Sequence, residues 1–301
     1  MIRKAVLGTV LAAVCGAAFA ALPNVAVYAT GGTIAGQSAA SDKTNYSAAK
    51  VGVDKLVQAV PELANIANVT SDQVAQIGSQ DMSDAVWLTL AKKINAECGK
   101  KDGFVITHGT DTMEETAYFL NLVTKSDKPV ILVGAMRPAT AISADGPMNL
   151  LEAVRVASSP EAKGKGVMIV MNDEINGARD VTKTNTTNPA TFKSPELGAM
   201  GYVSGNKVRF YKQSTKRHTT NSEFDASKLE TLPRVDIIYS HVDDDRIMAD
   251  AAVAAGAKGI IHAGTGNGSI ANPTMEGLKD AVAKGVVVVR SARVPNGATT
   301  V

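Results

Sequence analysis

The chain has 301 residues, of which 45% are apolar and 4% aromatic, and its formal net charge is +2. This length is enough to bury one large core or two modest ones. A charge so close to neutral gives no general electrostatic reason to bind nucleic acid or anionic lipid, and few aromatic side chains are present to stack on bases. The composition therefore favours a globular protein that acts on small neutral molecules.

The first 20 residues have the three parts of a secretory signal peptide. Arg3 and Lys4 form a positive segment, residues 5–16 form an apolar run too short to span a bilayer, and Ala18 and Ala20 supply the small residues of a cleavage site. We expect cleavage after Ala20 and a soluble periplasmic protein with no lipid anchor. Cleavage removes two positive charges, which lowers the net charge from +2 to 0. A buried N-terminal helix is the alternative, but it does not explain the order of these parts.

Short runs of β-branched apolar residues alternate with helical stretches along the rest of the chain. Several runs are apolar at every position, which is typical of strands that helices cover on both faces. The alternation predicts an α/β fold with a mainly parallel sheet flanked by helices. The expected strands are residues 25–29, 104–107, 130–133, 167–171, 235–239, 259–261 and 286–289, and the expected helices include 84–96, 113–123 and 275–283.

A polar segment divides the chain into two parts. Residues 212–233 lack a sustained apolar period and end at Pro233, so we interpret them as a linker. Residues 21–211 would then form a large N-terminal α/β domain, and residues 234–301 a smaller C-terminal α/β domain. Because no helix follows the last expected strand, we expect this second domain to be incomplete.

Two expected strands end in similar loops that are rich in threonine and glycine. The first is ATGGTIAG at residues 29–36, and the second is THGTDTME at residues 107–114. At the carboxyl ends of parallel strands, glycines let a ligand approach the backbone and leave N–H groups free to hold an oxyanion. Thr112 and Glu115 have the spacing of a capping box, which predicts a helix N-terminus. Tight turns capped by threonine are the alternative for either loop alone.

A third segment, residues 177–186, carries Lys183 among hydroxyl and amide side chains. This lysine is either a solvated surface charge or a partly desolvated amine that accepts a proton from a threonine, and the residues alone leave both open. A phosphate loop is excluded, because Gln37 stands where lysine is required. The four histidines are not spaced as metal ligands, so we expect no metal and no cofactor.

These segments resemble the bacterial type II L-asparaginases and the related glutaminase-asparaginases, and the likeness runs from Leu22 to the end of the chain. The resemblance implies hydrolysis of L-asparagine, with some hydrolysis of L-glutamine, by a threonine nucleophile. The motifs that carry it are TGGTIAG at 30–36, GSQDM at 78–82, HGTDTMEETA at 108–117, GAMRP at 134–138, SADGP at 143–147 and DVTKTNT at 180–186.

The resemblance also implies two catalytic groups. Thr33 would attack the side-chain amide carbon to give an acyl-enzyme ester, and Tyr46, on a loop after the first strand, would help to activate it. Lys183 would act as a base beside Thr110 and would be held by Asp111, much as aspartate holds histidine in a serine triad.

The remaining site residues implied by the resemblance bind the substrate. The main-chain amides of Gly32 and Thr110 would stabilise the oxyanion, and Ser79, Gln80 and Asp111 would grip the α-carboxylate and α-amino groups. The complete set of expected substrate contacts is Gly32, Ser79, Gln80, Thr110, Asp111, Ala135 and Ser269.

Substrate preference and assembly follow from the same resemblance. Gln80 is typical of asparagine-preferring members, whereas Ser269 is typical of the dual enzymes, so we expect a preference for asparagine with appreciable glutamine turnover. The resemblance further implies a homotetramer with active sites between subunits, closed by a glutamate that lies beyond the equivalent of Val301. Ser126 replaces the second cysteine of the family disulfide, which agrees with an unpaired Cys98.

Two other kinds of protein share parts of this description. A periplasmic amino-acid-binding protein would also be secreted and α/β, but it would not need paired threonine loops or a lysine beside them. The asparaginase-like subunit of a tRNA-dependent amidotransferase is disfavoured by the signal peptide and by the neutral charge after cleavage.

Overall fold

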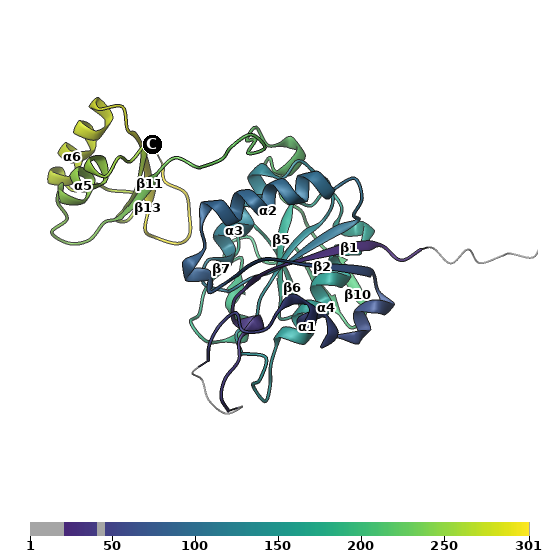
Figure 1. Ribbon diagram of the computed structural model, residues 1–301. Coiled ribbons are helices and arrows are strands. Elements are labelled where there is room, and N and C mark those ends of the chain that lie inside the picture. The colour runs from purple at the N-terminus through teal and green to yellow at the C-terminus, as the bar shows by residue number, and fades with distance from the viewer. Residues whose placement is uncertain (1–20, 41–45, 301) are drawn as a thin grey trace, which may run out of the picture.

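The computed structural model describes residues 21–40 and 46–300. The expected signal peptide, residues 1–20, lies outside the described residues. The described chain forms an eight-stranded sheet between residues 24 and 210 and a three-stranded sheet between residues 235 and 292. Figure 1 shows the two units joined by an extended segment. The predicted fold class, a large mainly parallel α/β unit followed by a smaller α/β unit, is confirmed.

The large sheet has the order β10-β9-β6-β5-β4-β3-β1-β2. The strands from β2 to β5 in this order pair in parallel, and the pairs β5–β6, β6–β9 and β9–β10 are antiparallel. The strands are β1 (Asn24–Gly31), β2 (Asn68–Ile77), β3 (Gly103–Thr107), β4 (Val130–Val133), β5 (Val167–Met171), β6 (Glu174–Gly177), β9 (Gly201–Ser204) and β10 (Lys207–Phe210).

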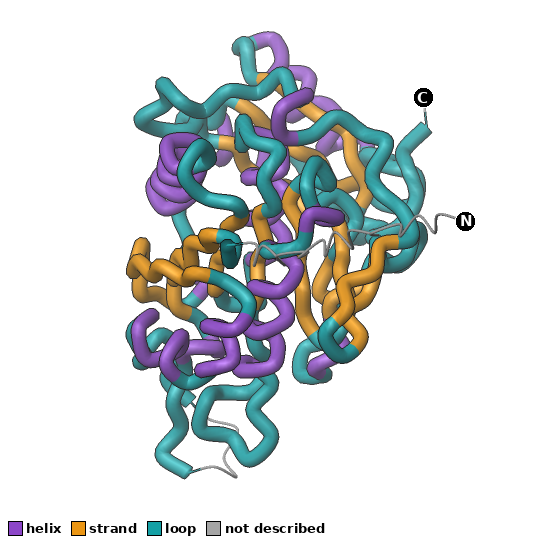
Figure 2. Tube along the Cα trace, turned by 90° about the vertical axis from the view of Figure 1, so that its right-hand side faces the viewer, coloured by secondary structure: helices purple, strands orange, loops and turns teal. Residues whose placement is uncertain are grey.

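Helices cover both faces of the parallel part of the sheet. They are α1 (Val53–Gln58), α2 (Asp84–Glu97), α3 (Met113–Val123) and α4 (Gly146–Ala157). Successive residues of a strand point to opposite faces. Accordingly, Val27 packs in the core formed with α1 and α4, whereas Tyr28 packs in the core formed with α2 and α3. Figure 2 shows the helices alongside the strands from a second direction.

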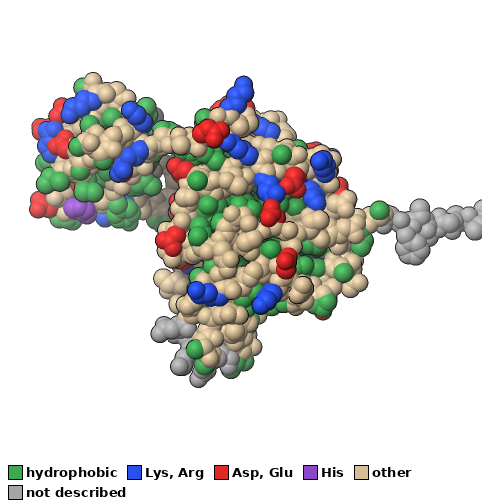
Figure 3. Space-filling model, viewed as in Figure 1, with side chains coloured by type: hydrophobic (Ala, Val, Ile, Leu, Met, Phe, Trp, Pro, Cys, Tyr) green, Lys and Arg blue, Asp and Glu red, His purple; other side chains and the backbone are tan. Residues whose placement is uncertain are grey.

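The C-terminal sheet is covered on one face only. It consists of the parallel strands β11 (Val235–Tyr239), β12 (Gly259–Gly264) and β13 (Val287–Ala292), with the helices α5 (Ile247–Ala254) and α6 (Asn272–Ala283). Ile238 and Ile260 are buried with the helices, whereas Ile237, Tyr239 and Val287 are 71%, 62% and 65% exposed. Figure 3 shows hydrophobic side chains on the surface of this unit. The apolar runs in β11 and β13 therefore do not indicate strands covered on both faces.

In the described part of the chain, no helix is long and apolar enough to cross a bilayer. Cys98 is a free, half-buried thiol, as expected.

Candidate active site

The two threonine-glycine loops lie side by side because they follow neighbouring strands. β1 and β3 pair in parallel, with Ala29 opposite Thr107. Beyond the strand ends the two backbones touch at glycines. A Cβ added to Gly32, whose φ is +81°, would lie 2.3 Å from both Cα and N of Gly109, so no side chain fits at this position. Thr33 directly follows Gly32, and Thr110 directly follows Gly109.

Thr33 begins the 3-10 helix η1 (Thr33–Ala35) and is 7% exposed. Its Oγ1 lies 2.5 Å from the hydroxyl oxygen of Tyr46, and either hydroxyl can be the donor. Gly36 allows this contact, since a Cβ there would lie 2.9 Å from the tyrosine ring. A backbone bridge between Gln37 and Ser47 holds the residue next to Tyr46. The structure thus brings together the hydroxyl expected to attack the amide and the one expected to help activate it.

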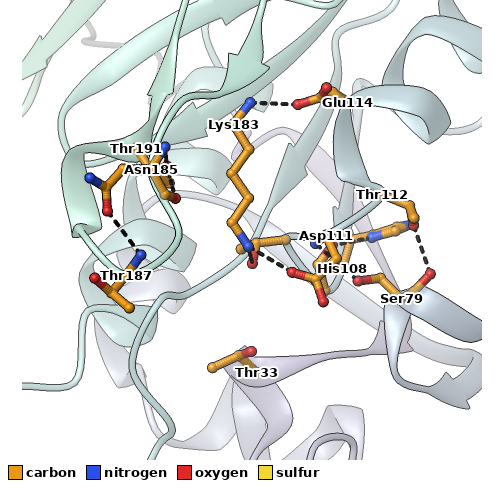
Figure 4. A network of polar contacts seen from close by, with 12 residues as sticks. Thr33, Ser79, His108, Asp111, Thr112, Glu114, Lys183, Asn185, Thr187 and Thr191 are labelled. Carbon is orange, nitrogen blue, oxygen red and sulfur yellow. Dashed lines mark hydrogen bonds and ion pairs between the residues drawn. The ribbon is translucent and has the colours of Figure 1, made fainter. Parts of the chain in front are cut away.

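Lys183 brings an amine to the loop after β3. It lies on β7 (Thr182–Lys183), which pairs with β8 (Phe192–Lys193) in a two-stranded sheet. Its Nζ donates to Thr110 Oγ1 at 3.0 Å and to Asp111 Oδ1 at 2.6 Å. The lysine side chain is 19% exposed and that of Asp111 is 60% exposed. Figure 4 shows Lys183 and Asp111 on the opposite side of the site from Thr33. The lysine is therefore partly buried and paired with a carboxylate, and its role as a base stays a prediction.

Glu114 is a site residue that sequence reasoning missed. In the first turn of α3, its carboxylate accepts a hydrogen bond from the backbone N–H of Lys183 at 2.5 Å and one from the hydroxyl of Thr182 at 2.9 Å (Figure 4). These contacts fix β7 against α3, so that the lysine side chain extends toward Thr110. The HGTDTMEE motif contains Glu114, but nothing in its spacing predicts a partner 69 residues away.

The predicted capping box at α3 is wrong in its hydrogen bonds, although the helix begins at Met113 as expected. Thr112 occupies the N-cap position without a side-chain capping bond. Its hydroxyl donates instead to the carbonyl of Ser79 at 2.8 Å, and Ser79 Oγ accepts from the N–H of Asp111 at 3.1 Å. Ser79 is buried in the 3-10 helix η3 (Ser79–Asp81) and therefore supports the loop after β3.

The other expected substrate contacts differ in their positions. Gln80 is exposed, and its side-chain amide donates to Asp81 at 3.2 Å. Ala135 is buried in the loop after β4. Ser269 lies in the C-terminal unit, where it pairs with Thr265 across a turn.

The two amides expected to hold the oxyanion are not equally free. The N–H of Gly32 donates to the carbonyl of Ile77 at 2.9 Å, which corrects its assignment as an oxyanion donor in this state. The N–H of Thr110 has no hydrogen-bond partner among residues 21–40 and 46–300. Since an oxyanion site needs donors that are not already used, Thr110 is the better candidate of the two.

His108 fixes the direction of that free N–H. A carbonyl can only accept, so Nδ1 of His108 must donate to Gly109 O, 2.6 Å away. Nε2 then accepts from the hydroxyl of Thr116 at 2.8 Å, which itself accepts from Trp87 Nε1 at 2.7 Å. Because N–H and C=O of a trans peptide point in opposite directions, the N–H of Thr110 points away from His108.

We expect the buried histidine to make folding stability depend on pH. Burial lowers the pKa of His108 from its ordinary value of 6.5 to about 4, against the opposing effect of the bond to Gly109. In the unfolded chain this histidine therefore binds a proton below pH 6.5, whereas in the folded chain it does so only below about pH 4. At about 1.4 kcal/mol per pKa unit, the free energy of unfolding falls by roughly 3 kcal/mol across this window. Urea unfolding at pH 7 and pH 4.5 measures the loss.

Two variants separate this contribution from that of the carboxyl groups. His108→Gln should be less stable at pH 7 but should lose less stability on acidification than the unmodified chain. His241→Gln, at an exposed histidine, should keep the original pH dependence. An unchanged acid-induced loss in His108→Gln would contradict the assignment.

No cluster of three or more His, Cys, Asp or Glu side chains that could hold a metal ion occurs in the described residues. The side chains that meet at this site carry hydroxyl, amine and carboxylate groups.

Two family models match the two parts of this chain. The family model "Asparaginase, N-terminal" matches residues 24–216, which is more than half of the chain, and "Glutaminase/Asparaginase C-terminal domain" matches residues 234–301. The chain belongs to the asparaginase family. The family predicted from the sequence motifs is confirmed.

Relatives of this asparaginase-family protein resemble it over nearly its full length. It is 53% identical to L-asparaginase 2 from Escherichia coli (strain K12), covering 99% of this chain and 85% of that protein. The identity is 53% to the probable periplasmic L-asparaginase of Haemophilus influenzae, over 93% of this chain and 80% of that protein. It is 49% to the glutaminase-asparaginase of Pseudomonas fluorescens biotype A, over 92% of this chain and 77% of that protein.

A solved structure is similar in fold to this asparaginase-family protein. The crystal structure of the probable cytoplasmic L-asparaginase from Campylobacter jejuni matches with a TM-score of 0.91 and 50% identity. The match covers 93% of this chain and 86% of that one.

Proposed function

We propose that this enzyme hydrolyses the side-chain amide of L-asparagine to L-aspartate and ammonia, and that of L-glutamine more slowly, with Thr33 as the nucleophile. The observation that carries the proposal is the backbone contact between Gly32 and Gly109. It supports a single cleft in which the Thr33–Tyr46 pair faces the group of Thr110, Asp111 and Lys183. The names of relatives that are L-asparaginases and glutaminase-asparaginases support both substrates.

In the first half of the reaction, Thr33 Oγ attacks the amide carbon and passes its proton toward Tyr46, 2.5 Å away. The carbonyl oxygen becomes an oxyanion, which the free N–H of Thr110 stabilises. The C–N bond then breaks, the nitrogen takes up the proton that Thr33 gave up and leaves as ammonia, and the acyl group remains as an ester on Thr33.

In the second half, water hydrolyses the ester. Lys183 accepts one proton of that water through Thr110, and Asp111 holds the amine in place through the 2.6 Å contact. The bond between the acyl carbon and Thr33 Oγ breaks, and the proton held by Lys183 passes to that oxygen. The acid product loses its remaining proton to solvent and leaves as a carboxylate. In this scheme Lys183 serves as base, and Glu114 positions it through its backbone.

An ammonia assay on the chain beginning at residue 21 tests the proposal. We expect ammonia from both amides, with kcat/KM higher for asparagine by about 10-fold to 200-fold, because the substrates differ by one methylene. Binding of asparagine without ammonia release would instead support an amino-acid-binding protein.

The domain limits and the location of the protein belong to the same proposal. We place the N-terminal catalytic domain at residues 21–211, the linker at 212–233 and the C-terminal domain at 234–301. The family matches over residues 24–216 and 234–301 support these limits.

The signal-peptide features of residues 1–20 and the relative named as periplasmic support export, although the similar crystal structure is named as cytoplasmic. Cell fractionation with N-terminal sequencing tests this; we expect a periplasmic chain that begins at Ala21.

A homotetramer with shared active sites completes the proposal. The exposed apolar face of β11 and β13 supports burial of the C-terminal unit against another subunit. The position of Ser269 in that unit supports its contribution to a neighbouring site. Light scattering of the purified protein tests the assembly.

A further inference from the structure

Asp145 occupies the N-cap position of α4 but makes no capping bond. An aspartate at this position ordinarily accepts from the amides of the first helical turn, which is worth about 1 kcal/mol. Here both carboxylate oxygens accept from the preceding loop instead. Oδ2 accepts from the N–H of Met136 and Oδ1 from that of Arg137, each at 2.9 Å. This carboxylate therefore holds the loop after β4 and leaves its own helix uncapped.

Asn149, one turn into α4, completes the hold on this loop. It is buried, and its Nδ2 donates to Asp145 Oδ2 at 3.2 Å and to the carbonyl of Gly134 at 3.0 Å. Its Oδ1 accepts from the N–H of Asn172 at 3.0 Å, which fixes the amide orientation. With donors and acceptor all used, Asn149 cannot turn without breaking contacts in the buried interior.

These contacts determine how the peptides on either side of Ala135 are turned. Since the N–H of Met136 points to Asp145, the carbonyl of Ala135 in the same trans peptide points away from Asp145. Since the carbonyl of Gly134 points to Asn149, the N–H of Ala135 points away from Asn149. The orientation of both peptides is thus set by α4.

The loop after β4 packs beside Thr110, and the start of α4 packs beside the residue that follows Thr33. A Cβ on Gly134 would lie 3.0 Å from Cγ2 of Thr110. A Cβ on Gly146 would lie 3.0 Å from Cγ1 of Ile34, the residue after the proposed nucleophile, and 3.5 Å from Cβ of Ala135. A small rotation of the loop would therefore move groups that lie close to the scissile amide.

We infer that Asp145 is a positioning residue, supported by Asn149, which turns the Ala135 carbonyl toward the amide nitrogen of the substrate. This inference rests on the proposed function. A carbonyl at that place accepts an N–H of the –CONH2 group, and it selects against a carboxylate, which has no hydrogen to donate. The residue acts through the backbone and does not touch the substrate.

Asp145→Asn tests this role by comparing substrate with product. The new NH2 faces a backbone N–H, so one of the two bonds to the loop is lost. We expect kcat/KM for L-asparagine to fall about 10-fold to 100-fold. The inhibition constant of L-aspartate, which lacks the amide nitrogen, should change less than about 3-fold. Equal weakening of both, or no change in either, would overturn the inference.

Two further variants keep the test decisive. Asp54→Asn, at an exposed aspartate in the first turn of α1, should leave both quantities unchanged. If Asp145→Asn does not fold, as judged by circular dichroism, Asn149→Ser is measured instead. It removes the bond to the Gly134 carbonyl and should give the same selective loss. Absence of ammonia release by the unmodified enzyme would refute the proposed function itself, which is a separate outcome.

Discussion

Replacing Thr33 with valine is expected to lower kcat for L-asparagine by at least about 10³-fold, which corresponds to about 4 kcal/mol of transition-state stabilisation. Valine keeps the shape of threonine but has no oxygen to attack the amide carbon. The main chain and the opposite group around Lys183 should remain in place, so substrate binding should persist. Stopped-flow or coupled ammonia assays give kcat, and calorimetry gives the affinity for asparagine.

Two controls separate the chemistry from the fold at Thr33. Thr33→Ser retains a hydroxyl and should recover much of the activity. Thr30→Val removes a buried hydroxyl near the end of β1, three residues before Thr33, which donates to the carbonyl of Thr107 at 3.0 Å. This change should cost about 1 kcal/mol of stability with little effect on kcat. Mass spectrometry of Thr33→Val with a slow substrate should find no acyl adduct. An adduct equal to that of the unmodified enzyme would show that another residue is the nucleophile.

Replacing Lys183 with methionine is expected to lower kcat by about 10²-fold to 10⁴-fold, the range typical of a lost general base. Methionine keeps an unbranched side chain of similar length but cannot accept a proton from Thr110. Stability should change by no more than about 1 kcal/mol, because the partner carboxylate of Asp111 is 60% exposed and remains solvated. Steady-state ammonia assays and urea unfolding measure the two effects.

Lys193→Met is the matched control for this prediction. Lys193 lies on β8 of the same two-stranded sheet and also pairs with a carboxylate, that of Glu174, but it has no contact with Thr110. Its replacement should leave kcat within about 3-fold of the original value. A comparable loss of kcat in both variants would mean that the small sheet needs both ion pairs, and that the amine of Lys183 is not the base.

The buried parallel strands could be predicted from the sequence because their hydrophobic pattern is strong. Every residue of β3, β4 and β5 is buried, and each run is apolar enough to be recognised alone. The edge strand β2 could not be predicted, because its sequence NVTSDQVAQI is mostly polar and only one side of it pairs, with β1. The antiparallel extension through β6, β9 and β10 was missed for a related reason, since these strands have only four residues each.

The sequence predicted which residues form the site more fully than it predicted which of them contact one another. The motifs named Lys183 and its two partners, but not Glu114, which holds β7 from α3. They suggested that Thr112 caps its own helix, whereas its hydroxyl bonds to Ser79 from the loop after β2. Such contacts depend on which strands become neighbours in the sheet. The spacing of residues within one motif does not predict that strand order.

The contact between Gly32 and Gly109 limits how this enzyme can be redesigned. Adjacent strands of a sheet lie about 4.8 Å apart, so the separation of the loops that follow β1 and β3 is inherited from the hydrogen-bonded ladder beneath them. Substitutions in the two loops cannot increase this separation unless the hydrogen bonds between β1 and β3 are broken. A variant selected for a bulkier amide should therefore change at the exposed rim, for example at Gln80, and leave the paired glycines untouched.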